Sequence, residues 1–161
     1  MLKVVLIRPE IPGNTGNVGR SCAAAGVELH LVKPLGFELT EARLRRAGLD
    51  YWERLAPRLH DSLDAFLKFL PEDARLLAFS AEGEKTHWQA PYDQDSWLVF
   101  GGESGGLPAD LRARWHDRLY RVPMLPGNRS LNLSAAAAVV IYEARRVLGG
   151  PPPWDHGPTQ P

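Results

Sequence analysis

Short apolar runs alternate with helix-like segments along most of this 161-residue chain, and this alternation restricts its fold more than any other feature. The runs are rich in β-branched or aromatic residues, which favour strands. They cover residues 2–7, 27–32, 75–79, 97–100 and 119–122. We therefore predict five strands.

The segments between these runs have the composition and end signals of helices. We predict helices over residues 15–25, 41–55, 62–70, 108–115 and 133–148, and the last of these stops at Gly149-Gly150 before three prolines. Strands separated by helices favour right-handed crossovers and a mostly parallel sheet that helices flank on both faces. The predicted fold class is therefore α/β, with ligands bound beyond the carboxyl ends of the strands.

Length and composition fit one domain, which we place at residues 1–150, with 44% hydrophobic residues to build its core. The proline-rich segment 151–161 has too few apolar residues to pack, so we expect a flexible tail. Nineteen basic and nineteen acidic residues cancel, so nucleic acid would have to bind local patches rather than a global field. Two clusters of arginines are either such patches or solvated helix faces. They are Arg43, Arg45 and Arg46, and then Arg112, Arg114, Arg118 and Arg121.

A single cysteine, Cys22, rules out an internal disulfide and fits a reducing compartment. Because it lies among small apolar residues, we predict that it is buried rather than reactive.

The chain begins directly with an apolar strand rather than a signal peptide, and no apolar run approaches the length of a membrane span, so we expect a cytoplasmic protein. Asp155 and His156 have no further ligands at useful spacing, so we expect no metal site.

Three polar loops follow three of the predicted strands, and the first two of them are rich in glycine. The first is residues 9–20, which includes Asn14 and ends at Arg20. The second is residues 101–108, where Glu103 stands among four glycines. The third is residues 128–134 (NRSLNLS), where Asn and Ser side chains gather at the start of a helix that continues into four alanines. One such loop would be an ordinary turn, but three loops at three strand ends predict a binding site.

With their flanking residues, the loops read EIPGNTGNVGR, LVFGGESGGLP and VPMLPGNRSLNLSAAAAVVIYEA. They resemble, in order and spacing, the three motifs of the SPOUT family of S-adenosylmethionine-dependent RNA methyltransferases, and the resemblance covers nearly the whole chain. The chain is most similar to the short members that 2′-O-methylate the wobble nucleotide of tRNA (cytidine or uridine 34), and the segment LRRAGLDYW at residues 44–52 resembles theirs too. The chain has no room for the RNA-binding extension of many relatives, which also favours this minimal subfamily.

The resemblance implies a SPOUT fold with a deep trefoil knot near the C-terminus, against the general rule that chains are unknotted. It also implies that S-adenosylmethionine lies bent in the knot with its adenine held by backbone groups. The pocket residues that it implies come from one strand end, the second loop and the third motif. They are Phe79, Ser80, Gly101, Glu103, Val122, Met124, Ser130, Leu131 and Asn132.

The resemblance assigns the catalytic role to Arg20, helped by Asn14, with Glu103, Ser130 and Asn132 shaping the site. A ribose 2′-hydroxyl must lose its proton as its oxygen attacks the sulfonium methyl in line, which requires no metal. Arginine is nearly always protonated, so Arg20 as a general base would need an unusual environment. An arginine that clamps a phosphate and steers the hydroxyl needs none.

The expected substrate is a tRNA anticodon stem-loop, whose unstacked loop nucleotide presents its ribose at low cost. A different ribose or base in tRNA or rRNA, and a catalytically silent RNA-binding module, are the alternatives. The sequence leaves open which tRNAs are used, whether C34 or U34 is preferred, and whether an accessory partner is needed. We also expect a homodimer through the helices at 15–25 and 133–148, so that Arg20 of one subunit lies beside the cofactor of the other.

Overall fold

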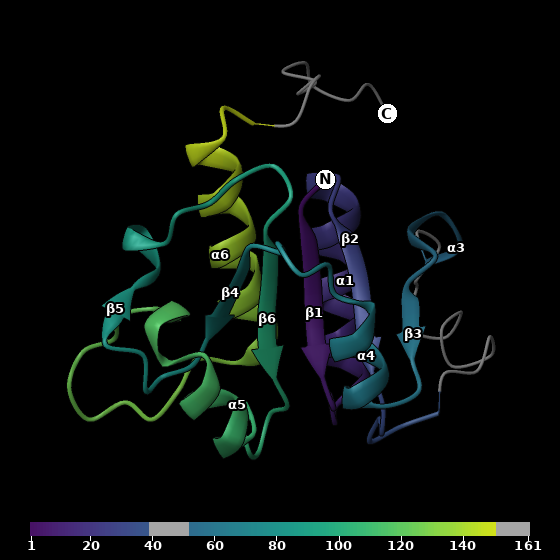
Figure 1. Ribbon diagram of the computed structural model, residues 1–161, viewed down its shortest axis with the longest axis horizontal. Helices are drawn as coiled ribbons and strands as arrows, with labels where there is room; N and C mark the ends of the chain where they lie inside the picture. Colours follow the sequence, from purple (N-terminus) through teal and green to yellow (C-terminus); the bar gives the residue numbers. More distant parts are fainter. Residues whose placement is uncertain (39–51, 151–161) are drawn as a thin grey trace.

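A computed structural model describes residues 1–38 and 52–150. Their strands form one sheet in the order β3-β2-β1-β6-β4-β7-β5, and every strand pair in it is parallel (Figure 1). The strands are β1 (Lys3–Ile7), β2 (Glu28–Val32), β3 (Arg58–His60), β4 (Leu76–Phe79), β5 (Lys85–Thr86), β6 (Trp97–Gly101) and β7 (Leu119–Arg121).

All five predicted strands are present, within one residue of their predicted bounds. The prediction of five strands was nevertheless wrong, because β3 and β5 add one short strand at each edge of the sheet. These two strands have three and two residues and are mostly polar, so they lack the apolar run by which strands are recognised in a sequence.

The helices follow the predicted alternation with two differences. Helix α1 begins at Pro12 rather than Thr15, because the fixed φ of proline suits the first turn of a helix. Only residues 52–55 of the helix predicted at 41–55 are described and helical, since residues 39–51, including Arg43, Arg45 and Arg46, lie outside the described residues. The helices are α1 (Pro12–Ala25), α3 (Trp52–Leu55), α4 (Leu63–Phe69), α5 (Ala109–Arg114) and α6 (Leu133–Val147), with 3₁₀ turns η1 (His87–Gln89) and η2 (His116–Arg118).

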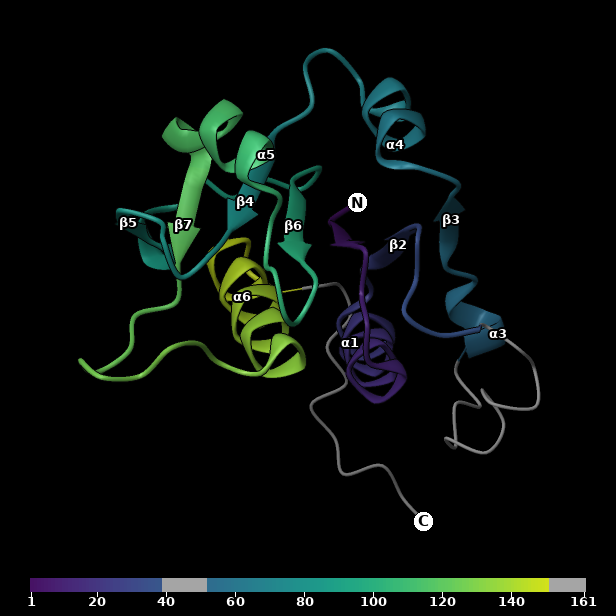
Figure 2. The same cartoon turned by 90° about the horizontal axis from the view of Figure 1, so that it is seen from below.

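Helices cover both faces of the sheet, with α1 and α6 side by side on one face and α4 and α5 on the other (Figures 1 and 2). Alternate residues of each strand point to opposite faces and build two cores. On β1, Val4 and Leu6 pack toward α1 and α6, whereas Val5 and Ile7 pack toward α4 and α5. This accounts for the continuous apolar run of that strand, which is covered on both sides.

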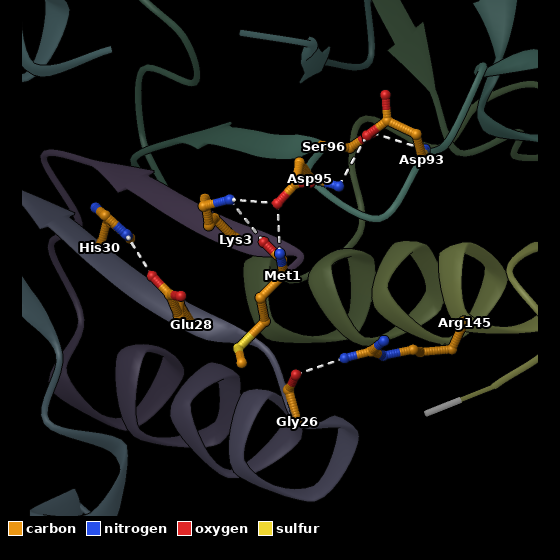
Figure 3. A network of polar contacts seen from close by, with 9 residues as sticks. All are labelled: Met1, Lys3, Gly26, Glu28, His30, Asp93, Asp95, Ser96 and Arg145. Atoms are coloured by element: carbon orange, nitrogen blue, oxygen red, sulfur yellow. Dashed lines mark hydrogen bonds and ion pairs between the residues drawn. The ribbon is translucent and has the colours of Figure 1, made fainter. Parts of the chain in front are cut away.

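Arg145 of α6 connects α6 to α1 near the amino ends of the strands (Figure 3). Its Nε donates to the carbonyl of Ala25 and its Nη2 to that of Gly26, so it caps the C-terminal end of α1. Helix C-termini carry unpaired carbonyls and partial negative charge, which a guanidinium satisfies. Burial lowers the pKa of Arg145.

Cys22 lies on α1 and is fully buried, as predicted. Burial raises the pKa of its thiol, which keeps it protonated and unreactive. Within residues 1–38 and 52–150, no helix has the length and apolar character needed to cross a membrane.

Candidate functional site

A cavity of about 440 Å³ opens at the carboxyl ends of β4 and β6. Its walls come from the segment after β4, the glycine-rich loop after β6, and the loop that joins β7 to α6. It is lined by Ile11, Asn14, Phe79, Ser80, Ala81, Glu82, Phe100, Gly101, Gly102, Glu103, Ser104, Gly105, Gly106, Arg112, Val122, Met124, Ser130, Leu131, Asn132, Leu133 and Ala136. Its size and its mixture of apolar and polar groups suit a ligand of nucleotide size.

Glu103 joins the loop after β6 to the start of α1. Its carboxylate accepts hydrogen bonds from the backbone N–H of Glu10 at 2.6 Å and of Ile11 at 3.1 Å, and from Nδ2 of Asn14 at 3.0 Å. Ile11 is the N-cap residue of α1 and its side chain makes no cap hydrogen bond. Glu103 therefore caps α1 from a distant loop, where the helix dipole favours a negative charge.

Glu10 makes the reverse connection between the same two loops. Its carboxylate accepts from the backbone N–H of Ser104 at 3.1 Å and from the hydroxyl of Ser104 at 2.7 and 2.8 Å. The two glutamates thus cross between the loops, and each satisfies donors of the other loop. This pairing fixes the loops at one side of the cavity.

Asn132 connects the third loop to this pair. Its Nδ2 donates to Oδ1 of Asn14 at 2.9 Å, while its own Oδ1 accepts from the backbone N–H groups of Ser134 and Ala135 and from the Ser134 hydroxyl. Asn132 is therefore the N-cap of α6. A continuous chain of hydrogen bonds, Glu103–Asn14–Asn132, holds all three predicted loops together.

Two glycines let the loop after β6 fold tightly against its neighbours. A Cβ at Gly101 would overlap the backbone of Gly106 and Leu107, and one at Gly102 would lie 2.5 Å from the carbonyl oxygen of Arg8. No side chain fits at either position. The loop is closed by an antiparallel bridge between Gly102 and Gly106.

The structure brings together most of the residues predicted for the site. All nine residues implied to bind the cofactor line the cavity, as does Asn14. Arg20 does not line it, and lies exposed on α1. Asn128 also turns away from the helix start, because its Nδ2 donates to the carbonyl of Leu125 in the preceding turn. Of the Asn and Ser side chains expected at the start of α6, Asn132 is the one that caps the helix.

The second arginine cluster is only partly a surface patch. Arg112 donates to the carbonyl of Leu107 and pairs with Glu82, and Arg121 donates to the carbonyls of Gly83 and Glu84. Arg114 and Arg118 are exposed.

Sequence reasoning missed Glu10, Ser104, Glu82 and Arg112 as parts of the site. Glu10 and Ser104 lie inside two of the recognised loops, but they are 94 residues apart and no local signal indicates that they pair. Glu82 and Arg112 are 30 residues apart, and the arginine cluster that contains Arg112 does not predict its pairing with Glu82.

Residues 1–142 of the 161-residue chain match the model of the SpoU rRNA Methylase family. The chain belongs to this family. Similar curated proteins include the tRNA (cytidine(34)-2′-O)-methyltransferase of Burkholderia ambifaria, 49% identical over 92% of this chain and 97% of its own length. The protein of the same name from Escherichia coli is 47% identical over 94% of this chain and 96% of its own length.

Solved structures of similar proteins agree with this family. One, from work on the 2-OH methylation of C/U34 on tRNA, has a TM-score of 0.85 and 51% identity, and the match covers 91% of this chain and 95% of that one. An AdoMet-bound rRNA methyltransferase from Sinorhizobium meliloti has a TM-score of 0.78 and 28% identity, over 91% of this chain and 56% of that longer chain.

Proposed function

We propose that this protein is an S-adenosylmethionine-dependent tRNA 2′-O-methyltransferase that modifies the wobble nucleotide, cytidine or uridine 34. The observation that carries the proposal is the hydrogen-bonded chain Glu103–Asn14–Asn132 in the lining of one cavity, in a protein about half identical to tRNA (cytidine(34)-2′-O)-methyltransferases over nearly its full length. We place its activity in the cytoplasm.

The residues of the cavity fit the proposed cofactor. Apolar side chains, among them Phe79, Val122, Met124 and Leu133, offer a surface for an adenine ring. The loop with Gly105 and Gly106 leaves open space where Cβ atoms would stand, so a ligand can approach its backbone closely. When bound, S-adenosylmethionine supplies an electrophilic methyl group on its sulfonium.

Some of the chain's own residues hold the loops in place, and others face the substrate. Glu103 and Asn14 hold the loops, because the Glu103 carboxylate already accepts three N–H groups and both polar atoms of the Asn14 amide are bonded. Neither side chain is therefore placed to accept the proton of the ribose 2′-hydroxyl. Ser130 and Asn132 shape the cavity at the start of α6. Arg20 positions the substrate, by gripping a phosphate and steering the 2′-hydroxyl toward its attack.

The position of Arg20 supports a homodimeric site. Arg20 is exposed on α1 and outside the wall of its own cavity, so a second subunit is needed to bring it to a cofactor. Helix α6, beside α1, leaves Val139 and Tyr142 42% and 44% exposed. Such apolar side chains on one face of a helix pair suit an interface between two copies.

We further propose that the segment from β7 into α6 is part of a trefoil knot. The supporting features are the tight contact of the loop after β6 with itself at Gly101 and Gly106, and the return of α6 to pack against α1. Chains crowded in this way need small residues where backbones meet.

The activity is tested with a tRNA and S-adenosylmethionine that carries a labelled methyl group. Nuclease digestion and mass spectrometry are expected to place the label on the ribose of nucleotide 34. A matched tRNA with a single 2′-deoxynucleotide at position 34 should accept none, because the attacking oxygen is missing. Label at another nucleotide would contradict the proposed target, and binding of RNA without any transfer would favour a silent RNA-binding module.

A further inference from the structure

The cavity contains a charged pair that none of the roles above uses. Nε of Arg112, on α5, lies 3.1 Å from a carboxylate oxygen of Glu82, in the segment after β4. Nη1 of Arg112 donates to the carbonyl of Leu107 at 2.6 Å. These two contacts hold the guanidinium between two walls of the cavity.

Arg112 is also distinguished by charge. Of the described residues that line the cavity, it alone carries a positive charge. The other charged lining residues are Glu82 and Glu103, and the carboxylate of Glu103 is already engaged with three N–H groups. An anionic group of a ligand in this cavity therefore has one cationic partner available.

The guanidinium keeps donors for such a ligand. Its five N–H groups form a planar fork that suits a carboxylate, and within residues 1–38 and 52–150 Nη2 donates no hydrogen bond. The side chain is 25% exposed, so its charge is less screened than that of a surface arginine. Glu82, whose side chain is 66% exposed, keeps the guanidinium in place.

We infer that Arg112 binds the carboxylate at the amino-acid end of S-adenosylmethionine, and that Glu82 positions its guanidinium. This inference rests on the proposed function. S-adenosylmethionine has one carboxylate, and an anion in a partly closed cavity needs a partner. Arg112 would thereby select the complete cofactor over adenosyl compounds that lack the carboxylate.

The first test needs no variant. Isothermal titration calorimetry compares S-adenosylmethionine with decarboxylated S-adenosylmethionine, which keeps the adenosine, the sulfonium and the amine. The wild-type protein is expected to bind the decarboxylated compound about tenfold more weakly, the usual effect of one charge-assisted hydrogen-bonded contact. Equal affinity for the two compounds would overturn the inference.

The second test assigns the difference to Arg112. Arg112→Met should weaken binding of S-adenosylmethionine about tenfold and leave decarboxylated S-adenosylmethionine unaffected, so the preference disappears. Arg114→Met, which removes an exposed arginine of the same helix, should keep the wild-type preference. Glu82→Gln should reduce the preference without abolishing it.

The outcomes separate this inference from the proposed function. A wild-type protein that binds neither compound would refute the cofactor assignment and, with it, this inference. Normal binding of S-adenosylmethionine by an Arg112→Met protein that still rejects the decarboxylated compound would refute only the role of Arg112. If Arg112→Met does not fold, the wild-type comparison and Glu82→Gln decide, and an unchanged preference in Glu82→Gln counts against the pair.

Discussion

Arg20 is the residue on which the proposed chemistry depends most. If it positions the substrate, Arg20→Ala should slow single-turnover methylation by about 10²–10⁴, the usual effect of losing one acid–base or positioning group. Cofactor affinity should stay near the wild-type value, because Arg20 does not line the cavity of its own chain. Rapid-quench methylation at saturating tRNA, with calorimetry of cofactor binding, measures both.

Arg20→Lys is the matched variant for this prediction. Lysine keeps the charge but loses the planar fork that can hold a phosphate and a ribose together, so it should restore little activity. Substantial restoration would instead indicate a purely electrostatic role. A wild-type methylation rate in Arg20→Ala would show that Arg20 is an ordinary exposed residue of α1 with no catalytic role.

Gly101 and Gly105 give a second matched pair at the residue scale. Gly101→Ala should destabilise the protein by about 3 kcal/mol, as overpacking does, because its Cβ would overlap the backbone of Gly106 and Leu107. Gly105→Ala should change the unfolding free energy by less than about 0.5 kcal/mol, since nothing lies within 4 Å of its added Cβ. Urea unfolding measures both, and equal effects would show that the loop is looser than its geometry indicates.

Among the elements, the edge formed by β2, β3 and α4 is built around a buried histidine pair. Nδ1 of His30 on β2 lies 2.9 Å from Nε2 of His60 on β3, and the two rings are stacked. The rings of Phe66, Phe69 and Trp97 surround them. Burial, and then the neighbouring His60, lowers the pKa of His30 to about 4, although Glu28 at 3.6 Å partly opposes this. Burial also lowers the pKa of His60, as does Arg58, while Asp61 raises it.

This pair should make stability depend on pH. In the unfolded chain, His30 takes up a proton as the pH falls through its ordinary pKa of 6.5, whereas in the folded protein it does so only near pH 4. The contribution of His30 to stability is therefore fully present well above pH 6.5 and is lost as the pH drops toward 4. Between pH 7.5 and 5, His30 should remove about 2 kcal/mol from the free energy of unfolding.

The measurement is urea unfolding at pH 7.5 and pH 5. A protein with both His30→Phe and His60→Phe keeps aromatic rings in the cluster but cannot titrate there, so it should lose clearly less stability at pH 5 than the wild type. His116→Gln, at an exposed histidine of η2, serves as the control and should behave as the wild type does. Identical pH dependence in the double variant would contradict the assignment.

The sequence predicted the central elements because their physical signal is local. The five inner strands are mostly apolar, and helices α1, α4, α5 and α6 have end signals such as Pro12 or Gly149 that act on neighbouring residues. Strands β3 and β5 were not predicted, because a strand of two or three residues forms through pairing with a neighbouring strand rather than through its own sequence pattern.

The candidate site was predictable in a different way. The nine residues predicted to bind the cofactor, all of which line the cavity, followed from the resemblance of the loops to known motifs. The sequence alone indicated only that polar loops follow strands. The contacts between loops were not predictable, because Glu103 meets Asn14 across 89 residues and Asn132 meets Asn14 across 118. No local pattern encodes such distant partners.

For the whole molecule, the homodimer is the first prediction to test. Val139→Glu should yield monomers, since it places a charge within the exposed apolar face of α6, and it should also abolish methyl transfer because Arg20 would no longer reach a second subunit's cofactor. Light scattering at micromolar concentration and the methylation assay are the two measurements. Leu59→Glu, at a side chain 47% exposed on edge strand β3, should remain dimeric. A fully active wild-type monomer would refute the shared site.

The proposed knot is tested by stretching one molecule from its two ends. A knotted chain tightens around a residual loop, so its unfolded contour should stay shorter than the roughly 3.3–3.6 Å per residue of a free chain. Optical tweezers measure this contour. An extension equal to that of an unknotted chain of 161 residues would refute the knot.

The bond from Arg145 to the end of α1 spans 120 residues, and this separation bears on how the protein is made. A ribosome that adds about 5–20 residues per second needs roughly 6–24 s to synthesise that stretch. During this time the first helix exists without the last helix that covers its flank and caps its end. The nascent chain therefore carries an incomplete core until translation is nearly finished, and its burden on cellular chaperones is set by the speed of the ribosome as much as by the stability of the finished fold.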